Sequence, residues 1–316
     1  MDKAAAVDKA AAWVPTWWPR FRRIAGPLLG LVLAGIAGFA LWRISQTTDW
    51  PTVAQAITAR MDGRLLLGAG LLLVSTACFT SYDWIASRVV GRPLGLWSAA
   101  QVALVAQGIA LNIGNSFVMG GLVRLRLLVA RDWPPLDIAG QTMLCVLAAN
   151  LGAATLGGWA WLLAGPTAPM FTLLLAAGGV LLAPLLVGSC ANPAVRVDPR
   201  IPVPTVRTAA LLVGLGVLEK IASAGVLALL LPALGTPLPT VLACFLAAVV
   251  VGKASQVPGG LGVIEVAFLH LLPVQPTGPL LAETLAALLL WRVGYYLTPA
   301  IFGAVLYVAV RPRPGN

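Results

Sequence analysis

Long apolar runs recur along this sequence, and they limit the folds open to it more than any other feature. A helix that crosses a bilayer needs about 20 predominantly apolar residues. Six runs approach or exceed that length, at residues 24–43, 65–88, 138–164, 170–189, 208–231 and 280–309. The sequence therefore predicts an all-α integral membrane protein that crosses the membrane several times.

The composition agrees with a lipid environment. Of the 316 residues, 59% are hydrophobic and only 10% are charged, too few to cover a surface that faces water. The net charge of +10 comes from basic residues at the ends of the apolar runs, such as Arg20, Arg22 and Arg23. This placement is typical of positive-inside topology and excludes a nucleic-acid partner.

Cysteine and histidine spacing argues against a metal or disulfide framework. The four cysteines fall singly in or beside apolar runs, where they serve as small hydrophobic residues. The single histidine, His270, has no partner at ligand spacing. We therefore expect neither a metal nor a cofactor.

Two further regions, 96–130 and 239–273, are expected to be helical hairpins interrupted by glycine. The strings SFVMGGL (Ser116–Leu122) and SQVPGGL (Ser255–Leu261) share the pattern SxVxGGL. In the first region we expect a helix to about Asn112 and a break from Gly114 through Gly120 and Gly121; in the second we expect the break at residues 256–260, with Pro258, Gly259 and Gly260.

The loop charges predict how these hairpins enter the membrane. Arg88, Arg92 and Arg131 flank the first region, whereas the segments 232–239 and 273–279 around the second carry no charge. With basic loops inside, the first hairpin enters from the cytoplasm and the second from outside, and both are re-entrant.

The same reasoning predicts two inverted repeats, each with three spans and one re-entrant hairpin, and both termini in the cytoplasm. An odd number of spans per repeat turns the second copy upside down. The predicted divisions are an interfacial segment, the first repeat, the second repeat and a short cytoplasmic tail, at 1–23, 24–164, 165–309 and 310–316.

Ionisable residues at membrane depth are the candidate site. Each costs about 2.5–3.5 kcal/mol at the centre of a span unless it meets a partner or a wet cavity. One interpretation is mutual ion pairs that hold the bundle together; the other is a translocation path, with two arginines as a phosphate seat and carboxylates for a cationic head group. The candidates are Asp83, Arg124, Arg126, Glu219, Lys253, Glu265, Arg292 and Tyr295.

Four blocks carry a resemblance to a known family: YDWIASRVVGRPL (Tyr82–Leu94), ALNIGNSFVMGGLVRLRLL (Ala110–Leu128), KASQVPGGLGVIEVAFLHLLP (Lys253–Pro273) and LLLWRVGYYLTP (Leu288–Pro299). In this order they resemble the transmembrane flippase domain of the bacterial lysylphosphatidylglycerol synthase/flippase (MprF) family.

The resemblance implies a non-enzymatic translocator of phospholipid in the bacterial cytoplasmic membrane. Full-length members move aminoacylated phosphatidylglycerol to the outer leaflet, which repels cationic antimicrobial peptides. By the same resemblance, Asp83, Arg124, Arg126, Glu219 and Glu265 fall on polar positions expected to matter for translocation.

Full-length members continue into an aminoacyl-transferase domain that this sequence does not contain. We therefore expect a separate lipid synthase or transferase as partner, a different lipid, or a longer natural chain. Self-association stays open. So do two alternative functions, namely a translocator of polyprenyl- or hopanoid-linked lipids and a membrane scaffold for a separate synthase.

An intramembrane protease is the alternative from another class. The pairs Tyr82-Asp83 and Gly260-Leu-Gly262 resemble the two motifs of intramembrane aspartyl proteases. The second motif would need an aspartate directly after its last glycine, because two carboxylates share one proton in that chemistry. Val263 occupies that position, so we expect no catalysis.

Overall fold

The computed structural model describes residues 49–60, 62–113, 116–165, 183–190 and 203–309, together with Phe39, Trp42 and Gln46. These residues form helices and no strands. The run predicted at 24–43 lies almost entirely outside them, and of the run at 170–189 only α9 (Ala183–Ser189) lies inside.

Four helical segments are long and apolar enough to cross a membrane, and they coincide with four of the predicted spans. They are α4 (Gly63–Val89), α7 (Pro135–Ala164), α10 (Val206–Leu230) and the segment Gly278–Tyr307. The last begins with α13 (Gly278–Arg292), passes through a π-helical turn, η5 (Val293–Leu297), and continues as α14 (Thr298–Ala309).

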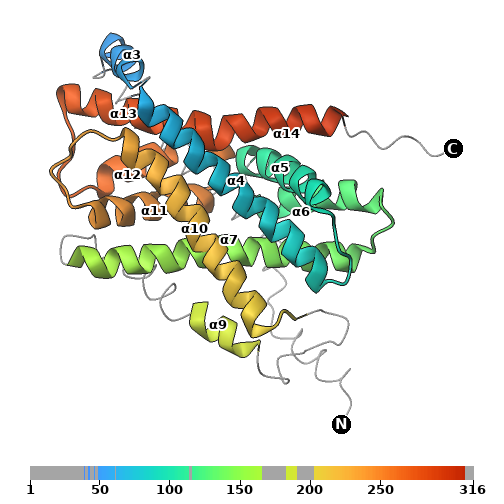
Figure 1. Cartoon of the computed structure of the whole chain (residues 1–316). Helices are drawn as coiled ribbons and strands as arrows, with labels where there is room; N and C mark the ends of the chain where they lie inside the picture. Colours follow the sequence, from blue (N-terminus) through green and yellow to red (C-terminus); the bar gives the residue numbers. More distant parts are fainter. Residues whose placement is uncertain are drawn as a thin grey trace, which may run out of the picture.

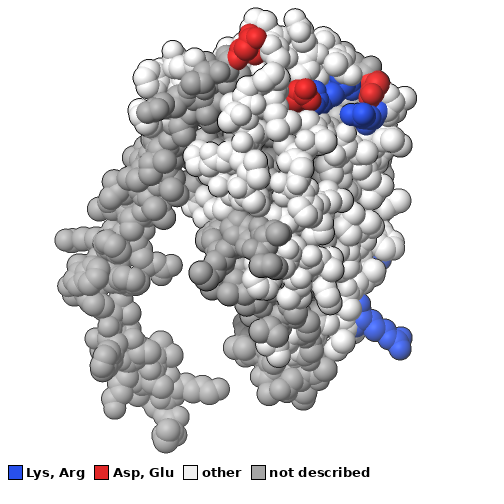
Figure 2. Space-filling view, turned by 90° about the vertical axis from the view of Figure 1, so that its left-hand side faces the viewer, with Lys and Arg blue, Asp and Glu red and all other residues white. Residues whose placement is uncertain are grey.

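The outer faces of these helices suit lipid better than water. Leu66 and Leu73 on α4 and Leu163 on α7 are more than 70% exposed, which water would penalise and lipid does not. Figure 2 shows charged side chains gathered mostly near one end of the face in view, above a largely uncharged surface. The chain is thus consistent with a membrane protein.

The long helices cross at the centre of the molecule. Helices α4 and α10 pack side by side, and α10 also crosses α7. The rod formed by α13, η5 and α14 lies across the α4–α10 pair from α7 and is called the α13–α14 rod (Figure 1). A short helix, α3 (Trp50–Ala59), packs on α13. Aromatic rings fill the core beside the rod, where Trp291 stacks on Tyr295 with ring centres 5.5 Å apart.

Two pairs of shorter helices lie on opposite sides of the α4–α10 pair (Figure 1). The first pair is α5 (Leu96–Ile113) and α6 (Ser116–Val129). The second is α11 (Leu238–Ala254) and α12 (Val263–Leu271), joined through a 3-10 turn, η4 (Pro258–Gly260). Both regions expected to be helical hairpins are therefore paired helices.

The break predicted in the second pair is confirmed. Pro258 cannot continue the hydrogen-bond ladder of a helix, and Gly259, Gly260 and Gly262 all have positive φ, between +59° and +76°. The chain therefore turns here before α12 begins at Val263.

In the first pair α5 ends at Ile113 and α6 begins at Ser116, so the break predicted from Gly114 through Gly121 is wrong at Gly120 and Gly121, which lie inside α6. A helix tolerates glycine where packing requires a small residue. No proline stands beside these two glycines to end the helix. A Cβ on Gly120 would lie 3.3 Å from the guanidinium of Arg124 and 3.4 Å from the Cβ of Ala110. Here glycine makes room for a buried arginine and for α5.

The π-helical turn follows from Pro299, the second residue of α14. Proline has no N–H for the carbonyl four residues earlier, and its ring clashes with that carbonyl, so the preceding turn widens. The side-chain amide of Asn112 on α5 donates to the carbonyl of Tyr296 at 3.0 Å. This bond supplies a partner for backbone in a region where lipid offers none.

Helices α7 and α10 cross so closely that their backbones touch at Gly152 and Gly216. A Cβ on Gly216 would collide with the carbonyl oxygen of Ala148, and one on Gly152 would collide with the backbone of Gly216. We predict that Gly216→Ala destabilises the protein by about 1–3 kcal/mol, because the helices must separate.

Gly214→Ala is the matched control for that substitution, since a Cβ at Gly214 on the same helix would have no atom within 4 Å. It should be neutral or slightly stabilising, because alanine favours helix over glycine. Thermal unfolding in detergent micelles compares the two variants, and equal midpoints would contradict the close crossing.

Candidate functional site

All three carboxylates predicted at membrane depth are buried, and each is paired with a basic residue. Asp83, Glu219 and Glu265 are 1%, 0% and 6% exposed. Breaking a buried pair leaves an uncompensated charge, so the two pairs that join different helices, Asp83–Arg124 and Glu265–Arg292, constrain the helices they join.

Asp83 on α4 holds Arg124 of α6 in a two-pronged ion pair. Nε and Nη2 of the guanidinium donate to the two carboxylate oxygens, each at 2.8 Å. Gln141 on α7 donates to Oδ1 of Asp83 at 2.9 Å, and the thiol of Cys145 lies 3.7 Å from the same oxygen. Both oxygens of Asp83 are thus occupied by partners from α6 and α7.

Glu219 on α10 lies in a second network. Oε2 lies 2.7 Å from Nζ of Lys220, and Oε1 accepts from the hydroxyl of Tyr295 at 2.8 Å and from Ser75 at 3.2 Å. Lys220 also donates to the Tyr295 hydroxyl at 3.1 Å. The π-helical turn presents Tyr295 to this network, which links α4, α10 and η5.

Glu265 and Arg292 fix the glycine turn of the second helical pair. Arg292 Nε donates to Oε1 of Glu265 at 2.6 Å, and Nη1 donates to the carbonyl of Gly259 at 2.8 Å. A longer bond of 3.4 Å runs from Nη2 to the carbonyl of Gly260. The guanidinium therefore holds α12 and the turn before it against α13.

The interpretation of these ionisable residues as mutual ion pairs thus describes the geometry of Asp83, Glu219 and Glu265 well. The other interpretation needs Arg124 and Arg126 to lie together as a phosphate-binding site, and in the structure they do not. Residues two apart on a helix point about 200° away from each other, and Arg126 is exposed over the ring of Tyr307, at 5.3 Å.

A cavity of about 110 Å³ lies between the two helical pairs. Residues of α4, α5, α6, α7, α10, α11 and η5 line it. Its basic side chains are Arg124, Lys220 and Lys253, and its uncharged polar or tyrosine side chains are Tyr82, Gln107, Asn150 and Tyr295. None of its lining residues is acidic.

Lys253 is the cation that gives this cavity its charge. Arg124 and Lys220 each have a carboxylate partner within 2.8 Å, which is Asp83 for Arg124 and Glu219 for Lys220. Lys253 donates to Oδ1 of Asn150 at 3.2 Å and has no carboxylate partner in the part of the chain that the structure describes. A positive charge without a carboxylate partner among apolar helices is unfavourable, and an anion that entered the cavity would neutralise it.

The predicted site did not include Tyr82, Gln107 or Asn150, because the prediction relied mainly on charged residues. Gln107 and Asn150 are uncharged polar residues inside apolar helices, and that signal was available. What the sequence could not show is that all three face the same cavity.

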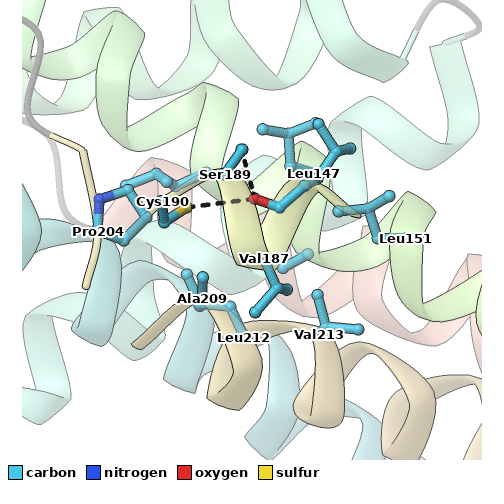
Figure 3. Close-up of a pocket in the computed structure, with 12 residues that line it drawn as sticks. Leu147, Leu151, Val187, Ser189, Cys190, Pro204, Ala209, Leu212 and Val213 are labelled. Atoms are coloured by element: carbon cyan, nitrogen blue, oxygen red, sulfur yellow. Dashed lines mark hydrogen bonds between the residues drawn. The ribbon is translucent and has the colours of Figure 1, made fainter. Parts of the chain in front are cut away.

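A second pocket, drawn in Figure 3, has a different character. It measures about 200 Å³ and lies between α7, α9 and α10, with mostly aliphatic walls. The hydroxyl of Ser189 and the thiol of Cys190 both donate to the carbonyl of Leu186, at 2.7 and 3.4 Å. These groups have a partner already, so the pocket suits hydrocarbon rather than a charged group.

Within the described residues, no three His, Cys, Asp or Glu side chains gather as a metal site requires.

We predict that Arg292→Gln destabilises the protein by about 3–5 kcal/mol, because it leaves the carboxylate of Glu265 buried without its cation. Adding Glu265→Gln to the same chain removes that charge and should restore part of the loss. Thermal unfolding in detergent measures both variants. A double variant no more stable than the single one would show that the ion pair is not what holds the turn.

Comparison with known proteins adds a relative but no function. No family model matches the chain. The chain is 27% identical over 297 residues to the uncharacterized protein slr0712 of Synechocystis sp., a match that covers 90% of this chain and 91% of that protein. A match of that extent spans both helical pairs.

Proposed function

We propose that this protein is a lipid translocator, a flippase or scramblase, that moves an anionic or aminoacylated phospholipid across a bacterial cytoplasmic membrane. The observation that carries the proposal is the cavity between the two helical pairs, whose lining brings Arg124, Lys220 and Lys253 together and contains no carboxylate. A basic cavity lined by apolar helices fits a lipid phosphate better than it fits a structural core.

In this mechanism the head group enters the cavity while the acyl chains stay in lipid. The phosphate meets Lys253 first, because its charge has no carboxylate partner among the described residues. Arg124 and Lys220 add to the positive potential but remain held by Asp83 and Glu219. The apolar walls strengthen the attraction, because charge is poorly screened away from water.

The contacts between helices support the further proposal of two inverted repeats. Under that duplication α4 corresponds to α10, the pair α5–α6 to α11–α12, and α7 to the α13–α14 rod. Helix α5 packs on α14, and its counterpart α11 packs on α7. Inverted repeats can exchange access between the two sides by rocking about a fixed site. The re-entrant path of both pairs and membership of the MprF family belong to the same proposal.

Proteoliposomes containing phosphatidylglycerol labelled on an acyl chain test this function. The wild type should move the labelled lipid between leaflets faster than empty vesicles do. Lys253→Gln should slow that movement about tenfold or more, because a hydrogen bond to a charged group contributes about 1.5–3 kcal/mol.

Arg126→Gln serves as the control, since it also removes one positive charge but faces Tyr307 outside the cavity. It should leave the rate unchanged. Equal loss in both variants would mean that surface charge, not the cavity, governs movement. No movement by the wild type would favour the alternatives, a polyprenyl or hopanoid lipid or a scaffold for a separate synthase.

A further inference from the structure

Two residues that line the cavity each carry a buried polar atom without a hydrogen-bond partner among the described residues. The atoms are the hydroxyl of Tyr82 and Oε1 of Gln107, and the two residues are 1% and 7% exposed. Both residues line the cavity. Buried polar groups in proteins are nearly always hydrogen-bonded, so a group left without a partner beside a cavity indicates a ligand atom.

The type of partner follows from the chemistry of each atom. The carbonyl oxygen of Gln107 can only accept a hydrogen bond, so it needs a donor. The hydroxyl of Tyr82 can donate or accept. The ring of Tyr82 packs edge-on against Phe79, with centres 5.5 Å apart, and both residues line the cavity.

The charge of the cavity excludes an amine as that donor. Arg124, Lys220 and Lys253 line the cavity, and no acidic residue does. Asp83 and Glu219, the carboxylates nearest to these cations, are already bonded by basic partners. An ammonium group would meet like charges in an apolar surrounding, which is strongly unfavourable. A neutral hydroxyl can donate to Gln107 without that penalty.

We infer that the cavity selects a head group that carries a phosphate and free hydroxyl groups, such as phosphatidylglycerol, and rejects one that carries an amine, such as lysyl-phosphatidylglycerol. The phosphate pairs with Lys253, and Gln107 and Tyr82 bind the hydroxyls. This inference rests on the proposed function, because it names the substrate of the same cavity. It chooses between the anionic and the aminoacylated lipid that the proposed function allows.

The test compares phosphatidylglycerol with phosphatidylpropanol, which has the same charge and nearly the same size but no hydroxyls. Lysyl-phosphatidylglycerol is the third lipid. Movement is measured in proteoliposomes, and binding is measured separately on the full chain in detergent. The wild type should bind and move phosphatidylglycerol about tenfold better than phosphatidylpropanol, since a site that hydrogen-bonds a hydroxyl rejects an analogue without one. Lysyl-phosphatidylglycerol should be the poorest of the three.

Two small substitutions assign the selectivity to its residues. Tyr82→Phe removes only the hydroxyl, and Gln107→Leu removes only the polar end of a side chain of similar size. Each should bring the ratio between phosphatidylglycerol and phosphatidylpropanol toward one. Gln101→Leu is the control on the same helix, because Gln101 bonds to Arg131 instead of lining the cavity. It should keep the wild-type ratio.

Each outcome decides one point. If the wild type bound the two anionic lipids equally, the inference that the cavity recognises hydroxyl groups would be wrong. If it bound and moved lysyl-phosphatidylglycerol as well as phosphatidylglycerol, the inference that the cavity excludes amines would be wrong. Selective binding without movement would leave this inference standing and overturn the translocator. Neither binding nor movement would overturn both. Glycerol 3-phosphate bound as tightly as the lipid would assign the site to a soluble polyol phosphate instead.

Discussion

The structure depends on the cost of placing charge in an apolar surrounding. Each of the three carboxylates at depth has a cation within 2.8 Å, and two of these pairs join a short helix to a long one. Asp83 and Arg124 join α4 to α6, and Glu265 and Arg292 join α12 to α13. Because lipid gives no hydrophobic force to press helices together, such polar contacts and close packing must hold the bundle.

The same pairing sets the charge of the cavity. With Asp83 and Glu219 turned toward their own partners, no carboxylate lines the space between the helical pairs, and Lys253 remains there with only Asn150 as an identified partner. The residues that stabilise the bundle and those that would meet a ligand are therefore different. Loss of activity on mutating Asp83 would report on structure first, whereas loss on mutating Lys253 would report on the cavity.

The fold could be predicted further than the site. Length and apolarity are local properties, so the four described spans and the proline-glycine turn were predictable. The helical state of Gly120 was not predictable, because only its neighbours Arg124 and Ala110 show that this glycine provides space inside a helix and does not end one. The site depended on direction as well as depth. Arg124 and Arg126 share a helix and a charge but face different surroundings, and only helix geometry separates them.

The crossing of α7 and α10 has a consequence for sequence comparison. Since the backbones meet at Gly152 and Gly216, no side chain from any other amino acid fits there without moving a helix. The two glycines, 64 positions apart in the numbering of this chain, are therefore a fingerprint of the arrangement itself. Distant chains can be sorted by it where overall identity is too low to be informative: those that share this crossing must retain both glycines, and those that lack either must pack these helices in another way.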